Sequence, residues 1–146
     1  MNNAIELKNV SRRAGKSFAL QDVSLSVPAG SIYGFLGPNG SGKTTTIGMF
    51  MGMLKPDQGT IQLLGKAVPG ELKSILARVG YVPERPHVYP SLTVGEQVKY
   101  HSSFFKLWDE GWAKELMGSL RIDADQKISR MSKGEVGKLL LLLALS

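Results

Sequence analysis

One glycine-rich segment constrains this sequence more than any other. Residues 37–44 read GPNGSGKT; they follow the apolar run SIYGFL and precede TTIGMFMGMLK, in which apolar residues recur at helical spacing. This is the pattern G-x-x-x-x-G-K-[ST] in the context that it needs, with a strand before it and a helix after it. The glycines permit backbone angles that turn several N–H groups inward, and the positive end of the helix adds to this cradle for an anion. The segment therefore predicts a site for a nucleoside triphosphate.

The side chains of this loop have separate predicted roles. Lys43 supplies a positive charge for the β- and γ-phosphates, and Thr44 offers a hydroxyl to Mg²⁺. Thr45 can add a hydroxyl near the α-phosphate. A glycine-rich turn with an incidental lysine is the alternative, which four specified residues in the correct context disfavour. The expected nucleotide-binding residues are Gly37, Pro38, Asn39, Gly40, Ser41, Gly42, Lys43, Thr44 and Thr45.

Hydrophobic patterning predicts several strands around the loop. AIELKNV and DVSLSV alternate apolar and polar residues, as half-buried strands do, with the basic turn SRRAGKS between them. Residues 31–37 form a continuous apolar run, which is typical of a strand buried on both faces. Two further strands are expected, one after the turn at residues 56–59 and one at residues 79–84 that proline stops.

Helical patterns follow the loop and fill the second half of the chain. One helix is expected directly after the glycine-rich loop, and a short amphipathic one at residues 71–78. Thr93 and Glu96 have the spacing of a capping box before an apolar helix. Residues 109–120 and the closing stretch predict two more helices. Seven consecutive apolar residues, 139–145, cover every face of about two turns, so we expect this last helix to be buried all round.

The composition fits one compact domain and excludes several functional classes. The chain has 146 residues, of which 42% are hydrophobic and none is cysteine, so a disulfide framework or a thiolate metal site is excluded. The longest apolar run is too short for a membrane span of about 20 residues. A formal charge of +6 favours anionic partners, but the basic residues are scattered, which argues against a nucleic-acid partner. We expect a soluble, cytoplasmic protein.

Four segments together resemble the ATP-binding subunit of ABC transporters. They are LGPNGSGKTTT, GYVPE, YPSLTVGEQV and MSKGEVGKLLLLLAL, and the resemblance extends over residues 4–146. GYVPE and SKGE are most similar to the ATPases that drive ABC-2-type exporters. The resemblance implies an α/β fold, a P-loop NTPase core with N-terminal antiparallel strands and a mostly parallel sheet, together with a helical subdomain.

The resemblance also implies a division of the chain. Residues 1–85 would form the nucleotide-binding core, residues 86–131 the helical subdomain, and residues 132–146 the signature helix. In the family the domain continues into a strand that carries the Walker B aspartate and the catalytic glutamate. Both are expected beyond Ser146, so the domain is expected to be C-terminally incomplete and this chain alone to hydrolyse ATP poorly.

Two further sites follow from the resemblance. Glu84 stands where the family usually has a glutamine that contacts Mg²⁺, and a carboxylate also suits this hard cation. Thr44 and Glu84 are thus the expected metal ligands, and the less favoured alternative for Glu84 is a surface charge at a strand end. The signature residues Ser132, Lys133, Gly134 and Glu135 would contact the γ-phosphate of ATP held by a second subunit, in a head-to-tail dimer. Apart from the family, Ser132 and Glu135 form a capping box at a helix N-terminus.

The family's adenine-stacking aromatic residue is missing. Its position falls on Ala14, which cannot stack on a base. Arg12 or Arg13 could lay a guanidinium plane on the base instead, and Phe18 is a third candidate whose strand position favours the core. Loss of an aromatic stack costs about 1–3 kcal/mol, so weaker binding and a looser choice between ATP and GTP are expected.

The resemblance implies a subunit that binds ATP and Mg²⁺ and powers transport across a membrane. The expected partners are a transmembrane permease subunit and a second ATP-binding subunit, and the expected location is the inner face of the cell membrane. Tyr89, Phe104, Phe105 and Trp108 are candidate anchors for the permease, though residues spaced like the last three are more often part of a core. The alternatives are a hydrolysis-deficient ATP-binding or assembly module, and a soluble family member in translation or DNA repair. The transported substrate cannot be read from the sequence.

Overall fold

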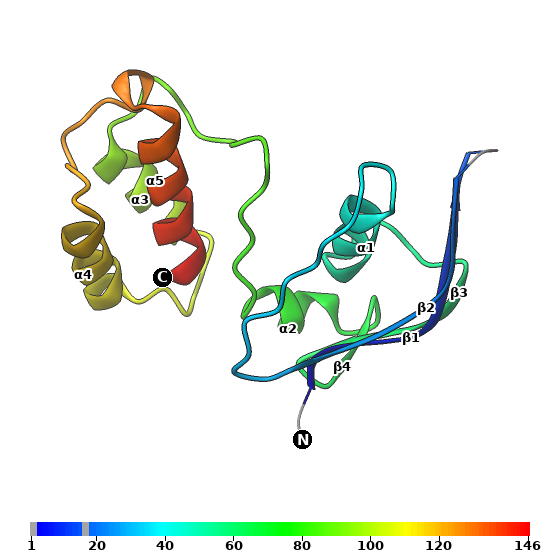
Figure 1. The fold of residues 1–146 in the computed structure, drawn as a ribbon. Helices are drawn as coiled ribbons and strands as arrows, with labels where there is room; N and C mark the ends of the chain where they lie inside the picture. Colours follow the sequence, from blue (N-terminus) through cyan, green and yellow to red (C-terminus); the bar gives the residue numbers. More distant parts are fainter. Residues whose placement is uncertain (1–2, 16–17) are drawn as a thin grey trace. The chain divides into compact units, whose positions relative to one another are not determined.

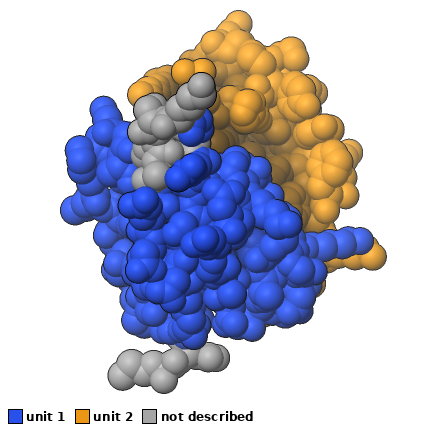
Figure 2. Space-filling view, turned by 90° about the vertical axis from the view of Figure 1, so that its right-hand side faces the viewer, with its two compact units in different colours: residues 1–76 blue, residues 77–146 orange. Residues whose placement is uncertain are grey.

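The computed structural model describes residues 3–15 and 18–146. The chain divides into two compact units, residues 1–76 and 77–146, which are coloured separately in Figure 2. Each unit has its own core and is described by itself. The predicted division at residues 85 and 131 remains a prediction.

The first unit is built on an antiparallel sheet of four strands in the order β2-β1-β3-β4 (Figure 1). The strands are β1 (Asn3–Ala14), β2 (Phe18–Pro28), β3 (Gln58–Leu63) and β4 (Lys66–Val68). Alternation places Leu7 of β1 opposite Leu25 of β2 and Ile61 of β3, and both Leu7 and Ile61 are buried. The first two strands and β3 confirm the sequence prediction. β1 also includes the basic residues that we expected in the turn.

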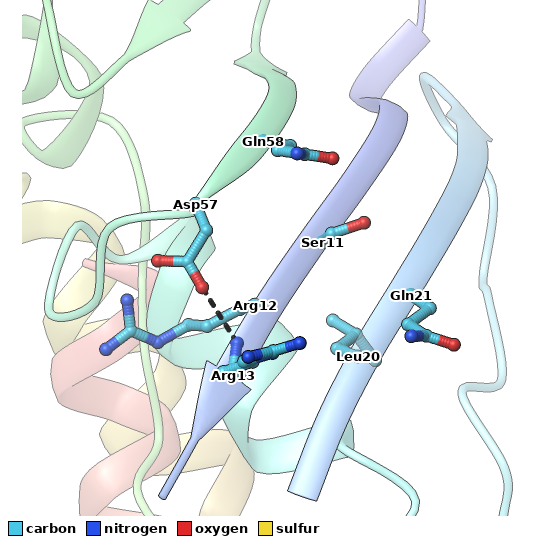
Figure 3. A pocket seen from close by; sticks show the side chains of 7 residues that line it. All are labelled: Ser11, Arg12, Arg13, Leu20, Gln21, Asp57 and Gln58. Carbon is cyan, nitrogen blue, oxygen red and sulfur yellow. Dashed lines mark hydrogen bonds between the residues drawn. The ribbon is translucent and has the colours of Figure 1, made fainter. Parts of the chain in front are cut away.

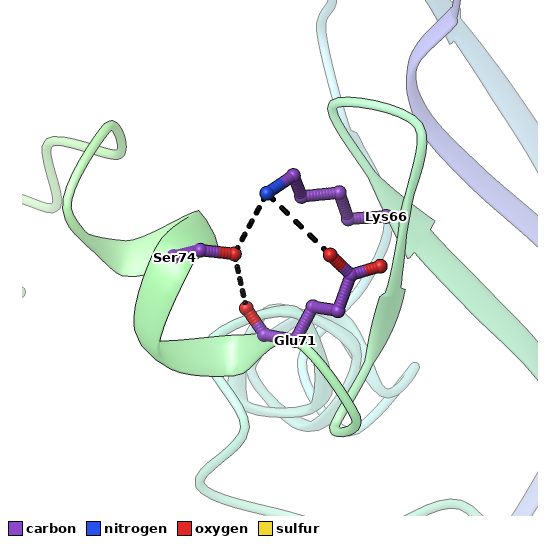
Figure 4. A network of polar contacts seen from close by, with 3 residues as sticks. All are labelled: Lys66, Glu71 and Ser74. Carbon is purple, nitrogen blue, oxygen red and sulfur yellow. Dashed lines mark hydrogen bonds and ion pairs between the residues drawn. The ribbon is translucent and has the colours of Figure 1, made fainter.

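Two helices pack on this sheet. α1 (Lys43–Phe50) packs against β3, and α2 (Leu72–Leu76) packs against β4. Lys66 joins β4 to the beginning of α2, since its Nζ donates to Ser74 Oγ at 2.9 Å and lies 3.4 Å from Glu71 Oε2 (Figure 4). This exposed network contributes little stability, because both charges are hydrated.

The strand predictions for residues 31–37 and 79–84 are wrong in this structure. Both segments run without regular secondary structure, and Ile32 and Leu36 are 104% and 92% exposed. Their apolar composition suits a buried strand, but a strand also needs neighbours that complete its hydrogen bonds. The sheet of the described residues pairs with neither segment.

The second unit contains three α-helices around one apolar cluster. They are α3 (Val94–Ser102), α4 (Glu110–Leu120) and α5 (Lys133–Leu145), and the short 3-10 helix η1 (Ile128–Arg130) precedes α5. Three residues of α5 bury their side chains against α3 and η1. The fully or nearly fully buried cluster consists of Val94, Val98, Ile128, Leu139, Leu142 and Leu143. The predicted capping box at Thr93 and the helix at residues 109–120 are confirmed.

The expectation that α5 is buried all round is wrong for the described residues. Leu141 and Leu145 are 42% and 54% exposed, while Leu139 and Leu142 are fully buried. The cause is that the helices of this unit cover one side of α5 only. In the parts of the chain that the structure describes, no helix is long and apolar enough to cross a membrane.

Candidate functional site

The glycine-rich loop ends on an uncapped helix N-terminus. Gly42 is the N-cap residue of α1 with φ 90° and makes no side-chain hydrogen bond, and Gly40 has φ 82°. These left-handed angles suit glycine, which lacks the Cβ that makes them costly. The first amides of any α-helix lack an acceptor within the helix. The amides of Lys43 and Thr44 are therefore left for a ligand at the positive end of α1.

Lys43 folds back over the loop that it follows. Its Nζ donates to the carbonyl oxygens of Gly37 at 2.6 Å and Pro38 at 2.8 Å. An ammonium group has three donors, so at least one remains for an anion. Lys43 therefore holds the loop closed and brings a positive charge to its rim.

Thr46 fixes the base of the loop, and sequence reasoning missed it. Its Oγ1 and its backbone N–H both donate to the Gly42 carbonyl oxygen, at 2.9 and 2.8 Å, and its side chain is fully buried. The signal was its position four residues after Gly42, where a threonine hydroxyl can reach back along the helix. Thr44 is exposed and Thr45 is half-buried, so both hydroxyls can serve a ligand.

The chemistry of this loop suits a polyphosphate. The loop combines backbone amides, the Lys43 ammonium group and the hydroxyls of Thr44 and Thr45. Its described side chains include no carboxylate, which would repel phosphate. Thr44 supplies one oxygen donor of the kind that Mg²⁺ prefers.

The predicted signature residues form a closed capping box at α5. Ser132 Oγ accepts the Glu135 N–H at 3.3 Å, and Glu135 Oε2 accepts the Ser132 N–H at 2.7 Å. The backbone hydrogen bond from Ser132 lowers the pKa of Glu135, and the hydroxyl of Ser132 and the amide of Gln126 add to this effect. Lys133 and Gly134 are exposed at the same helix end.

The two predicted metal ligands lie in different units. Thr44 is the second residue of α1 in the first unit, and Glu84 is exposed in a bend of the second unit. A shared Mg²⁺ ion at these two residues remains a prediction. Among the residues that the structure describes, no three histidine, aspartate or glutamate side chains lie close enough together to hold a metal ion.

A shallow pocket of about 320 Å³ lies where β1, β2 and the beginning of β3 meet (Figure 3). The Arg12 guanidinium donates a hydrogen bond to the Lys55 carbonyl oxygen, and the Arg13 backbone N–H donates to Asp57 Oδ2 at 2.8 Å. The side chain of Arg13 is exposed, and its guanidinium makes no hydrogen bond to another residue that the structure describes. Of the two arginines predicted to stack on a base, Arg13 is the freer one. The side chains of Ala14 and Phe18 lie outside the described part of the structure.

The family is decided by a match along most of the chain. The sequence model described as "ABC transporter" matches residues 20–146, which include the glycine-rich loop and the signature residues. The chain belongs to the ABC transporter family. Within the ABC transporter family, it resembles ATP-binding proteins of exporters.

Two of its curated relatives carry the same name. The chain is 37% identical over 147 residues to "Nod factor export ATP-binding protein I" of Burkholderia orbicola (strain AU 1054), covering 97% of the chain and 48% of the relative. It is 35% identical to the protein of that name from Bradyrhizobium diazoefficiens, covering 99% of the chain and 49% of the relative. The chain thus spans about half the length of the curated relatives that it matches.

Solved structures agree on the fold of this ABC family chain. A structure described as the ATP-binding subunit of an ABC transporter superposes with a TM-score of 0.81 at 26% identity, covering 97% of this chain and 61% of that one. The cbiO1 protein of Clostridium perfringens superposes with a TM-score of 0.84 at 19% identity, covering 99% and 62%, and this likeness shows the fold alone. The predicted α/β fold class and family are confirmed, whereas the strand pairs of the described residues are all antiparallel, because residues 31–37 and 79–84, two of the strands expected in a mostly parallel sheet, do not form strands.

Proposed function

We propose that this chain binds ATP with Mg²⁺ on residues 37–45 and contributes to an ATPase that drives export through a separate transmembrane subunit. The observation that carries the proposal is the uncapped N-terminus of α1, over which Lys43 folds back. Membership of the ABC transporter family and the names of the relatives support the direction of transport.

The residues of the loop would each act on the phosphates. Backbone amides at the start of α1 would bind the phosphate oxygens. Lys43 Nζ would give up one of its hydrogen bonds to a backbone carbonyl oxygen and donate to a β- or γ-phosphate oxygen instead. Thr44 would place its hydroxyl on the magnesium ion, with Glu84 as a second oxygen donor. When bound, this ion neutralises charge that develops on the phosphates.

A second copy of the chain would complete the site. Ser132, Lys133, Gly134 and Glu135 would face the γ-phosphate held by the other copy in a head-to-tail dimer. The exposed Ser132 hydroxyl and the Lys133 charge at the positive end of α5 support this role. A solved relative in the family is described as a dimeric ABC transporter cassette, which agrees with such an assembly.

The partner would be a permease in the membrane, with this chain on its cytoplasmic side. The second unit supplies the surface that we expect to dock, with Tyr89 and Phe104 exposed and Trp108 packed against the core.

The base would be held weakly. Arg13 is the exposed guanidinium nearest the family's adenine position, and no described aromatic side chain stands there. An arginine plane stacks on adenine and guanine alike. We therefore expect ATP and GTP to bind with similar affinity, and a large preference for ATP would contradict this.

Calorimetry with Lys43→Ala tests the proposal. The variant should lose at least about 30-fold in ATP affinity, because a charge-assisted contact of about 2 kcal/mol or more disappears. Lys55→Ala is the matched control, since Lys55 is exposed outside the loop and should leave ATP affinity unchanged. Equal ATP affinity in wild type and Lys43→Ala would refute the proposed site. Phosphate release by the same preparation then distinguishes an ATPase from a module that only binds ATP.

A further inference from the structure

Glu84 lies in the middle of an irregular segment, residues 80–89, which we call the Glu84 bend. The Glu84 side chain is exposed, and its carboxylate makes no hydrogen bond or ion pair to another residue that the structure describes. Surface loops are ordinarily more mobile than the elements that they connect. The Glu84 bend is instead held at both of its ends.

Gly80 holds the first end of the bend against the last turn of α5. A Cβ atom added to Gly80 would overlap the Ala144 carbonyl oxygen and would lie 2.8 Å from the carbonyl carbon of that residue. This part of α5 is fixed, because Leu142 and Leu143 are buried in the core of the unit. Only glycine, which has no Cβ, lets the chain lie this close to the helix backbone.

The Gln97 side chain holds the second end of the bend. Gln97 belongs to α3 and is 3% exposed, and its Oε1 accepts the Tyr89 N–H at 3.0 Å. The preceding residue, Val88, packs against the apolar cluster of this unit. An apolar residue would fill this position without the cost of burying an amide, so we attribute the glutamine to this hydrogen bond.

Two prolines stiffen the chain between these anchors. Pro83 and Pro86 stand on either side of Glu84. Each proline fixes its own φ and restricts the conformation of the residue before it. The chain between Gly80 and Tyr89 therefore has few ways to displace the carboxylate.

We propose that Gly80 and Gln97 are positioning residues that hold the Glu84 carboxylate ready for Mg²⁺. The inference rests on the proposed function, in which Glu84 is an oxygen donor to this ion. A ligand that its surroundings already hold in place binds without the entropy cost of ordering its segment. A carboxylate that served only as a surface charge would gain nothing from two anchors.

Calorimetry of ATP binding to the full chain, with Mg²⁺ and with EDTA, tests this proposal. We call the ratio of the two ATP affinities the magnesium gain. Gly80→Ala and Gln97→Met should each lower this gain about tenfold, as loss of a residue that orients a metal ligand typically does. ATP affinity in EDTA should stay unchanged, because both variants keep Lys43 and the glycine-rich loop. Methionine fills the core position of Gln97, so this variant tests the second anchor even if Gly80→Ala does not fold.

Two control variants lie in the same unit. Gly118→Ala adds a Cβ that meets no atom within 4 Å. Val98→Ala loosens the buried face of α3 beside Gln97 but leaves the Tyr89 hydrogen bond in place. Both should keep the full magnesium gain. An equal loss in Val98→Ala would show that the stability of α3 alone sets the gain and would overturn the proposal, as would an unchanged gain in Gln97→Met or in a folded Gly80→Ala.

Glu84→Ala separates this inference from the proposed function. In a chain without the Glu84 carboxylate, the two anchor substitutions should lower the magnesium gain no further, because they act through it. Additive losses would contradict positioning. If both anchor variants keep the gain that Glu84→Ala loses, only this inference fails. If Glu84→Ala keeps the full gain, the metal role of Glu84 is wrong, and the inference falls with it. Absence of ATP binding by the wild type would defeat the proposed function itself.

Discussion

Replacing Ser132 by alanine separates its role in helix α5 from its proposed role in a nucleotide-bound dimer. The chain offers a matched control, because Thr93 caps α3 in the same unit with the same chemistry. Ser132 Oγ accepts the Glu135 N–H at 3.3 Å, and Thr93 Oγ1 accepts the Glu96 N–H at 3.2 Å. In each box the glutamate carboxylate accepts a hydrogen bond of 2.7 Å from the cap residue's own N–H. The two boxes are thus equivalent as caps.

Both alanine variants should lose similar stability. Loss of a serine or threonine cap costs about 1 kcal/mol, which corresponds to about 4 °C in Tm for a chain of this size. Thermal unfolding followed by circular dichroism measures this. A cost near zero for either variant would contradict the capping geometry.

Only the Ser132 variant should affect the dimer. Ser132 Oγ accepts the Glu135 N–H, and its hydroxyl can turn away from the Glu135 carboxylate, whose pKa the backbone N–H and the hydroxyl of Ser132 lower, to donate to a phosphate of a second copy. A hydrogen bond to a charged group contributes about 1.5–3 kcal/mol, so its loss should weaken ATP-dependent dimerisation at least about tenfold. Light scattering over a concentration series, with and without ATP and Mg²⁺, measures this. Equal weakening by Thr93→Ala would show that stability alone explains the effect and would refute the role in the second copy's site.

Three other changes test the cap, the buried face and the exposed face of α5. Glu135→Gln should remove a stability gain that is pH-dependent: the accepted hydrogen bond lowers the folded-state pKa below its ordinary value of 4.5, so the gain is present above that value and is lost as pH falls through the folded-state pKa. Urea unfolding of both proteins at neutral pH and in acid checks this, and a difference that persists at the most acid pH would contradict it. Leu142→Ala should cost about 2–5 kcal/mol, because Leu142 is fully buried. Leu145→Ala, at a residue that is 54% exposed, should cost well under half as much in the same titration, and equal costs would refute the assigned core.

Local chemistry explains which parts of the fold the sequence predicts. The capping boxes at Thr93 and Ser132 depend on residues three positions apart, and the glycine-rich loop depends on eight consecutive residues, so both were visible in the sequence. The strands of β1 and β2 follow from alternation. The strand prediction for residues 31–37 failed because a strand needs hydrogen-bonding partners that are distant in the sequence, as well as a suitable composition. β4 has only three residues, too few for any periodic pattern.

The candidate site likewise has features that the sequence predicts and contacts that only the fold shows. Lys43 was predicted to bind phosphate, but its hold on the Gly37 and Pro38 carbonyl oxygens depends on how the loop folds back. The buried hydroxyl of Thr46 was missed for the same reason. Residue types thus reveal what a loop can bind, whereas the contacts that shape the empty loop require the fold.

The two helix N-termini proposed to meet phosphate differ in a way that orders their use. α1 begins at Gly42 without a side-chain cap, so its first amides await a ligand and no carboxylate competes. At α5, Ser132 and Glu135 already satisfy two amides, and the ionised Glu135 repels a phosphate that approaches. The positive charge of Lys133 offsets only part of this repulsion, since the side chain is exposed. The start of α1 is therefore suited to bind ATP alone, and the start of α5 to add a weaker contact once ATP is held, so we expect dimer closure to depend on prior nucleotide binding.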